Sequence, residues 1–87
     1  MLICEVIGHV WATKKEQALS GMKLMVVRQQ QPDGSPTDTT FVAADIVGAG
    51  IGEQVLVVSG STARRAMGVH EPPVDAAIVG IIDSVEA

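Results

Sequence analysis

The amino-acid sequence predicts a mainly β protein: a small five-stranded OB-like β-barrel with one short helix before the last strand. The chain has 87 residues, which suits one domain, so residues 1–87 are expected to fold as a single unit. Short segments rich in β-branched residues alternate with glycine, proline and aspartate, as strands alternate with turns. Trp11 and Phe41 are the two aromatic residues, so the core is expected to be aliphatic.

The first two strands are expected at residues 2–12 and 22–29, joined by a polar loop. One parity of the first strand is apolar, and the other mixes apolar and polar side chains. Both parities of the second strand are apolar, which predicts that protein covers both of its faces. We therefore expect Met25 and Val27 of this strand to contact a partner subunit.

Three further strands are expected at residues 41–47, 54–58 and 74–82, each bounded by glycine, proline or aspartate. Residues 32–36 read Pro-Asp-Gly-Ser-Pro, a turn signal between the second and third strands. Five short strands with a helix inserted before the last are typical of a partly open Greek-key barrel of the OB type.

The one helix candidate lies at residues 63–67, between the fourth and fifth strands. Ser61 or Thr62 is expected to cap its N-terminus, and Gly68 is expected to end it. Pro72 and Pro73 then favour an extended return to the last strand.

The composition indicates a protein that binds other protein chains. Hydrophobic residues make up 47% and charged residues 18% of the chain, and the mean hydropathy is +0.34. No apolar run approaches the roughly 18 residues that a membrane span needs. The surplus apolar surface therefore points to protein partners and not to a membrane. The N-terminus has no secretory signal pattern, and the single cysteine suits a reducing compartment, so a cytoplasmic location is expected.

The alternative interpretation is an OB-type nucleic-acid-binding module. That function needs clustered basic residues and aromatic side chains on which bases stack. The net charge of −4, the pI of about 4.9 and the two aromatic residues disfavour it. No nucleic-acid partner is therefore expected.

The residues that carry chemistry in other proteins do not form a recognisable catalytic set here. His9 and His70 have no cysteine or carboxylate at a metal-ligand spacing. Cys4 reads as a small buried hydrophobe. Three aspartates are expected to bind turn N–H groups: Asp45, and Asp75 and Asp83 near the ends of the last strand. We therefore expect no enzymatic activity, no metal and no cofactor.

A glycine-rich segment follows the third strand: Gly48, Ala49, Gly50, Ile51 and Gly52. Such a segment can cradle a phosphate, but a strand follows it where the dinucleotide fingerprint requires a helix. A tight loop between strands is the favoured interpretation, and in an oligomer such a loop can form a shared surface.

The chain is identified as resembling the EutN/CcmL family on two stretches. Residues 45–57 read DIVGAGIGEQVLV, and Gly60 to Arg64 read GSTAR; in this order the two are specific to the family. Residues 75–83 resemble the last strand of the family, so the resemblance covers nearly the whole chain. Thr62 departs from it, because a second serine is common there.

The resemblance implies a structural shell protein that forms a homopentamer. Such a ring occupies the vertices of a bacterial microcompartment shell, next to hexameric shell proteins. In a ring, small residues permit close approach of backbones, so we expect residues 48–52 near the five-fold axis. Arg64 and Arg65 form the one basic doublet of an acidic chain, and we expect them at a subunit or facet interface.

Overall fold

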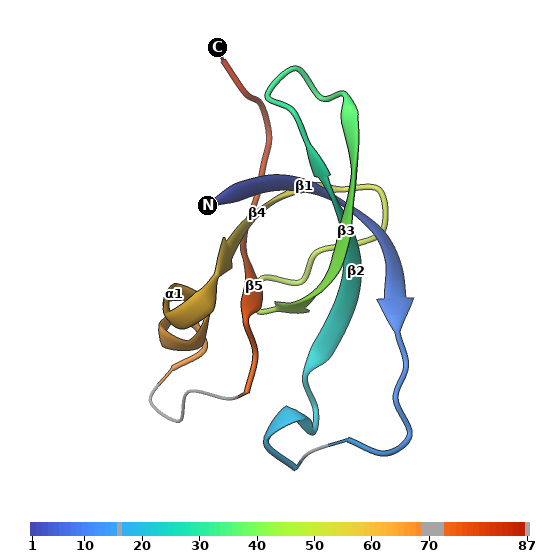
Figure 1. Cartoon of the computed structure of the whole chain (residues 1–87), viewed down its shortest axis with the longest axis vertical. Helices are drawn as coiled ribbons and strands as arrows, with labels where there is room; N and C mark the ends of the chain where they lie inside the picture. The colour runs from blue at the N-terminus through green and yellow to red at the C-terminus, as the bar shows by residue number, and fades with distance from the viewer. Residues whose placement is uncertain (16, 69–72, 87) are drawn as a thin grey trace.

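Five strands close into a barrel in the order β1-β2-β3-β5-β4, as the computed structural model shows (Figure 1). The structure describes residues 1–15, 17–68 and 73–86. In chain order the elements are β1 (Leu2–Val10), the 3₁₀ turn η1 (Gln17–Leu19), β2 (Lys23–Gln30), β3 (Pro36–Asp45), β4 (Gln54–Ser59), α1 (Gly60–Ala66) and β5 (Ala76–Ile81). The prediction of a mainly β barrel with one helix before the last strand is confirmed.

Four of the five junctions in the barrel are antiparallel, and the fifth is a short parallel one. β3 pairs with β5 at Ala44↔Ala77 and Asp45↔Ile78. By contrast, β3 pairs with β2 along most of its length. The first half of β3 therefore has β2 on one side and no paired strand on the other.

The core consists of aliphatic side chains, as the sequence predicts. Inside the barrel a buried cluster brings together Cys4, Val6, Met25, Val27, Ala43, Ala49, Val55, Val57, Ala76 and Ile78, with Leu2 and Phe41 partly buried against it. A second cluster under α1 contains Val58, Ala63 and Ala77. The helix therefore covers the outside of β4 and β5 and does not fill the barrel.

The third strand begins earlier than predicted, at Pro36 and not at residue 41. Pairing with β2 continues to Gln30↔Pro36, so the turn is confined to residues 31–35. Two hydrogen bonds from Ser35 to the Asp33 carboxylate fix this turn and lower the pKa of Asp33. The Pro-Asp-Gly-Ser-Pro pattern does form a turn, but pairing between β2 and β3 makes the turn shorter than predicted.

The helix also begins earlier than predicted. Its N-cap is Ser59, which makes no side-chain capping bond, so the prediction of Ser61 or Thr62 as the cap is wrong. Gly60 has φ of 62°, and its N–H donates to the Asp75 carbonyl at 2.8 Å. This hydrogen bond turns the chain directly out of β4 into the helix. Pro72 lies outside the described residues.

Candidate assembly surfaces

The glycine loop, residues 46–53, is held by the carboxylate of Asp45 at the end of β3. Its Oδ1 accepts hydrogen bonds from the N–H groups of Val47 at 3.0 Å and Gly48 at 3.1 Å. Its Oδ2 accepts one from Ala49 at 2.8 Å. The prediction that this aspartate binds turn N–H groups is confirmed, and its carboxylate fixes the first part of the loop.

Lys23 of β2 completes this network from the neighbouring strand. Its Nζ donates to the Ala49 carbonyl at 2.7 Å and lies 3.4 Å from Oδ2 of Asp45. The Asp45 side chain has no exposed surface, whereas that of Lys23 is 41% exposed. The buried carboxylate is therefore compensated by one cation and three N–H donors, as a buried charge requires.

The far side of the loop is fixed by Glu53. Its Oε1 accepts a hydrogen bond from the Gly50 N–H at 2.7 Å. The Gly52 N–H donates to the Val6 carbonyl at 2.8 Å, and the Val6 N–H donates to the Glu53 carbonyl at 3.0 Å. These bonds attach the loop to the middle of β1, and Ala49 is buried in the barrel core.

Three aliphatic side chains point outward from this fixed backbone. The exposed fractions are 44% for Ile46, 38% for Val47 and 60% for Ile51. Gly48 and Gly52 adopt φ of 80° and 91°, which favours glycine at both turns of the loop. The loop is therefore a rigid support for an apolar surface, which composition alone did not reveal.

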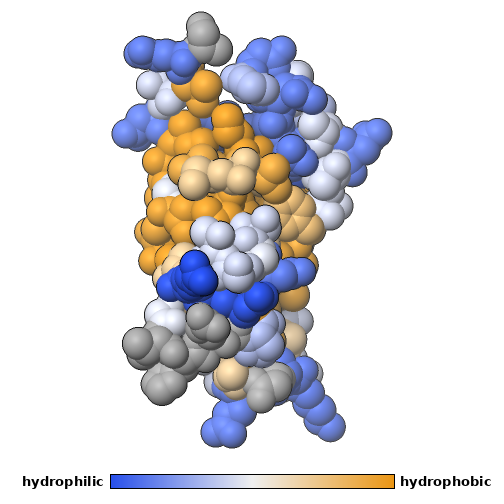
Figure 2. Space-filling model, turned by 60° about the vertical axis from the view of Figure 1, so that its left-hand side comes forward, coloured by the Kyte–Doolittle hydropathy of each residue, from blue (hydrophilic) through white to orange (hydrophobic). Residues whose placement is uncertain are grey.

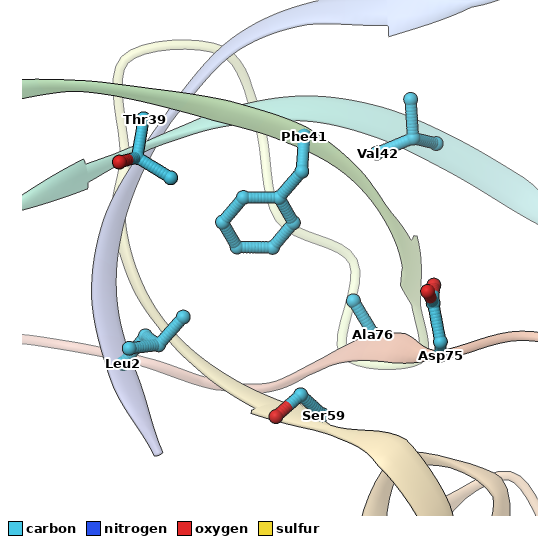
Figure 3. Close-up of a pocket in the computed structure, with 7 residues that line it drawn as sticks. All are labelled: Leu2, Thr39, Phe41, Val42, Ser59, Asp75 and Ala76. Carbon is cyan, nitrogen blue, oxygen red and sulfur yellow. The ribbon is translucent and has the colours of Figure 1, made fainter.

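A second apolar surface is a cavity of about 470 Å³ between the first half of β3 and the neighbouring strand ends, which we call the barrel mouth (Figure 3). Leu2, Phe41 and Ala76 line its base and belong to the core cluster or pack against it. Thr39, Val42, Ser59 and Asp75 line it as well. The mouth exists because β3 pairs with β5 only beyond it.

Apolar surface also extends over one side of the molecule. Figure 2 shows a broad hydrophobic area on the side that carries β4 and β5, with hydrophilic residues above and below it. Exposed apolar side chains include Met1, Ile81 and Val85. Small soluble domains rarely leave this much apolar surface in water. A protein partner is therefore expected to cover the area.

Arg64 and Arg65 lie in the last turn of α1. Arg65 is exposed and Arg64 is half-buried. Among the described residues, the one salt bridge is that of Lys23 with Asp45, so neither arginine forms an ion pair with a carboxylate of the described residues. The placement of the doublet at an interface stays a prediction.

Comparison with known proteins places the chain in a family. The family model described as "Ethanolamine utilisation protein EutN/carboxysome" matches residues 1–83. The chain belongs to this family. It is 46% identical to the bacterial microcompartment shell vertex protein GrpN of Rhodospirillum rubrum, covering 99% of this chain and 97% of that protein. It is 45% identical to the carboxysome shell vertex protein CcmL of Synechocystis, covering 98% of this chain and 85% of that protein.

Solved structures of family members have the same fold. The structure described as a pentameric microcompartment shell protein, GrpN from Rhodospirillum rubrum, matches with a TM-score of 0.91 and 45% identity over the whole of both chains. An ethanolamine utilization protein, EutN, matches with a TM-score of 0.94 and 40% identity, covering 100% of this chain and 91% of that one. This chain therefore shares the fold of these family members along its whole length.

The structure corrects the predicted partner contact at Met25 and Val27. Both side chains are fully buried inside the barrel, which leaves them no surface for a partner. The opposite parity of β2 points outward, where Leu24 and Val26 are half-buried. The prediction failed because both parities are apolar, so the sequence pattern did not indicate which face points inward.

The remaining candidate groups do not converge on a reactive centre in the described residues. His9 stacks on Trp11 with ring centroids 5.3 Å apart. Burial raises the pKa of the Cys4 thiol to about 11, which keeps it protonated and unreactive at neutral pH. No metal-binding group of His, Cys, Asp or Glu occurs among the described residues, and His70 lies outside them. No described helix is long and apolar enough to cross a bilayer.

Proposed function

We propose that this chain is a structural subunit of a bacterial microcompartment shell, and that it forms homopentamers that close the vertices. The observation that carries the proposal is the full-length likeness to a shell protein described as pentameric. Relatives named as shell vertex proteins support it at 41–46% identity. The protein acts inside the cell, as part of the shell.

The physical role follows from shape. Flat sheets of hexameric shell proteins cannot close a container, because closure requires points of higher curvature. A five-fold ring supplies such a point, and its edges must match those of its six-fold neighbours. The function therefore lies in the surfaces of the ring, and no active site is required.

Two parts of the chain are assigned to this assembly as part of the proposal. Residues 48–52 lie near the five-fold axis, where the three glycines of this fixed loop permit close approach of backbones. Arg64 and Arg65 lie at a subunit or facet edge, where a guanidinium can bind a carboxylate in bidentate fashion. Their lack of an acidic partner within the described part of the chain supports this assignment.

The proposal includes neither catalysis nor nucleic-acid binding. His9 is stacked on Trp11, Cys4 is buried, and the carboxylates of Asp45 and Glu53 bind loop amides. A nucleic-acid surface would need free basic side chains next to stacking aromatics. Phe41 instead packs against the core, and Lys23 pairs with Asp45.

Deletion of the gene in its host tests the proposed function. We expect electron micrographs of the deletion strain to show shell sheets or elongated, open shells, because facets still form but vertices do not close. Expression of the wild-type chain from a plasmid should restore closed polyhedra. Closed polyhedra in a deletion strain that has no second vertex gene would contradict the proposal.

The same strain tests the role of the basic doublet. Complementation with the Arg64→Glu, Arg65→Glu variant should leave shells open, because the charge reversal places like charges at an edge. The purified variant should keep the β-sheet circular dichroism spectrum of the wild type, since both side chains lie on the helix surface. Normal closure with this variant would show that the doublet is only a solvated helix face.

A further inference from the structure

Two of the uncovered apolar surfaces, the glycine loop and the barrel mouth, lie at opposite ends of the ladder between β1 and β4. That ladder pairs Leu2 with Val57 at one end and Glu5 with Gln54 at the other. Leu2 and Ser59, which follows Val57 closely in β4, line the mouth. The loop leads into Gln54 and is bonded to Val6. A loop therefore cannot fill the mouth of its own barrel.

The mouth exposes the core of the barrel and requires a cover. Its base is formed by Leu2 and Phe41, which pack against the buried core cluster. Val42 at its edge is 45% exposed, and the adjoining half of β3 has no strand paired on that side. In Figure 3 the ring of Phe41 points into the opening between β3 and the strand ends that carry Leu2 and Ser59.

The glycine loop has the features of an inserting surface. Its outward side chains, Ile46, Val47 and Ile51, match the apolar base of the mouth in chemistry. Hydrogen bonds to Asp45 and Glu53 already hold the backbone, so packing against a partner orders little additional chain. The carboxylates of Asp45 and Glu53 both accept hydrogen bonds from loop N–H groups. This limits their electrostatic repulsion of the Asp75 carboxylate at the mouth.

Other exposed apolar residues offer a weaker fit. Met1 and Val85 lie near the two ends of the chain, without a comparable set of fixing bonds. Trp11 is 87% exposed but is a single side chain stacked on His9. Among the described residues, the glycine loop alone presents three large aliphatic side chains from one fixed segment.

A ring needs two different, complementary surfaces on every subunit, because each copy contacts one neighbour with the first and the other neighbour with the second. We propose that the glycine loop of one copy packs Ile46, Val47 and Ile51 into the barrel mouth of the next copy around the ring. This inference rests on the proposed function, since it requires a ring. It assigns the occupant of the mouth to a second copy of this chain.

Cysteine cross-linking of the full chain tests this contact. The double variant Val47→Cys, Thr39→Cys places one thiol on the loop and one at the mouth, with Val47 changed to a residue of similar size. A short bismaleimide should then produce a ladder from dimer to pentamer on a denaturing gel. The single Thr39→Cys variant should give no ladder, and the single Val47→Cys variant should give a weaker ladder than the pair, because a heterologous contact joins unlike residues. The buried Cys4 thiol should not contribute.

The matched control is the double variant Val47→Cys, Ser35→Cys. Ser35 is also exposed, but it lies in the turn between β2 and β3 and does not line the mouth. This control should give no more ladder than the single Val47→Cys variant. If the Val47 and Thr39 pair assembles poorly, Ile51→Cys with Val42→Cys tests the same contact from other positions.

The outcomes separate this inference from the proposed function. A stronger ladder with the Val47 and Thr39 pair than with the control supports the contact. Rings of pentamer mass that give no ladder with either pair would overturn the inference and leave the proposed ring intact. An equal ladder from the Ser35 control would also overturn it. A wild-type chain that stays monomeric in the same buffer would overturn the proposed function itself.

Discussion

Replacing Asp45 with alanine is expected to lower the free energy of unfolding by about 3 kcal/mol, since a hydrogen bond to a charged group contributes about 1.5–3 kcal/mol. The variant removes the acceptor of three loop N–H groups and leaves Lys23 without its carboxylate. Two of these N–H groups can bind water, which keeps the loss below the sum of the three bonds. Denaturant unfolding at fixed protomer concentration measures the effect.

Two further variants make the Asp45 result specific. Asp45→Asn keeps an oxygen for Val47 and Gly48 but turns an NH₂ group toward Ala49, so its effect should be intermediate. Asp38→Ala removes an exposed carboxylate from the same strand, and its effect should stay within about 0.5 kcal/mol. Equal stability of the Asp45 and Asp38 variants would contradict the role of Asp45 as the support of the glycine loop.

Replacing Met25 with alanine is expected to cost about 3 kcal/mol, because truncating a large core side chain typically costs about 2–5 kcal/mol. Met25 has no exposed surface and lies in the barrel cluster. For a domain of this size, such a loss lowers the melting temperature by about 12 °C or more. A calorimetric or circular dichroism melt at fixed protomer concentration measures the shift.

Met22→Ala is the matched control for Met25→Ala. Met22 precedes β2 and is half-buried, so the same truncation should cost less than about 1 kcal/mol. If Met25→Ala instead weakened association while the fold kept its stability, the partner contact predicted from the sequence would be right and the core assignment wrong.

The local pattern of the chain was sufficient to predict five strands and the position of the helix between the fourth and fifth along the chain. Alternating or continuous apolar runs between glycine, proline and aspartate marked all five, since strand propensity and turn chemistry act over short distances. The start of β3 was missed because its first residues, Pro36 to Thr40, are polar and become a strand only through pairing with β2. The sequence also did not indicate which side chains of β2 point into the barrel. That orientation depends on how the five strands close the barrel, which is again a non-local property.

The local structure of the candidate assembly surfaces could be predicted in part. The glycine pattern indicated a tight loop, and an aspartate at a strand end indicated bonds to turn amides, because both depend on neighbouring residues. The outward aliphatic side chains of the loop and the barrel mouth were not predicted. The mouth depends on where β3 and β5, which are distant in sequence, begin to pair. No local signal carries that information.

Native mass spectrometry of the purified full chain at micromolar concentration is the most direct test of the central claim. We expect a dominant species of about 45.5 kDa, five times the 9.1 kDa of one chain. The minor species are expected to be smaller members of the same series. A dominant monomer or hexamer under the same conditions would contradict the vertex assignment.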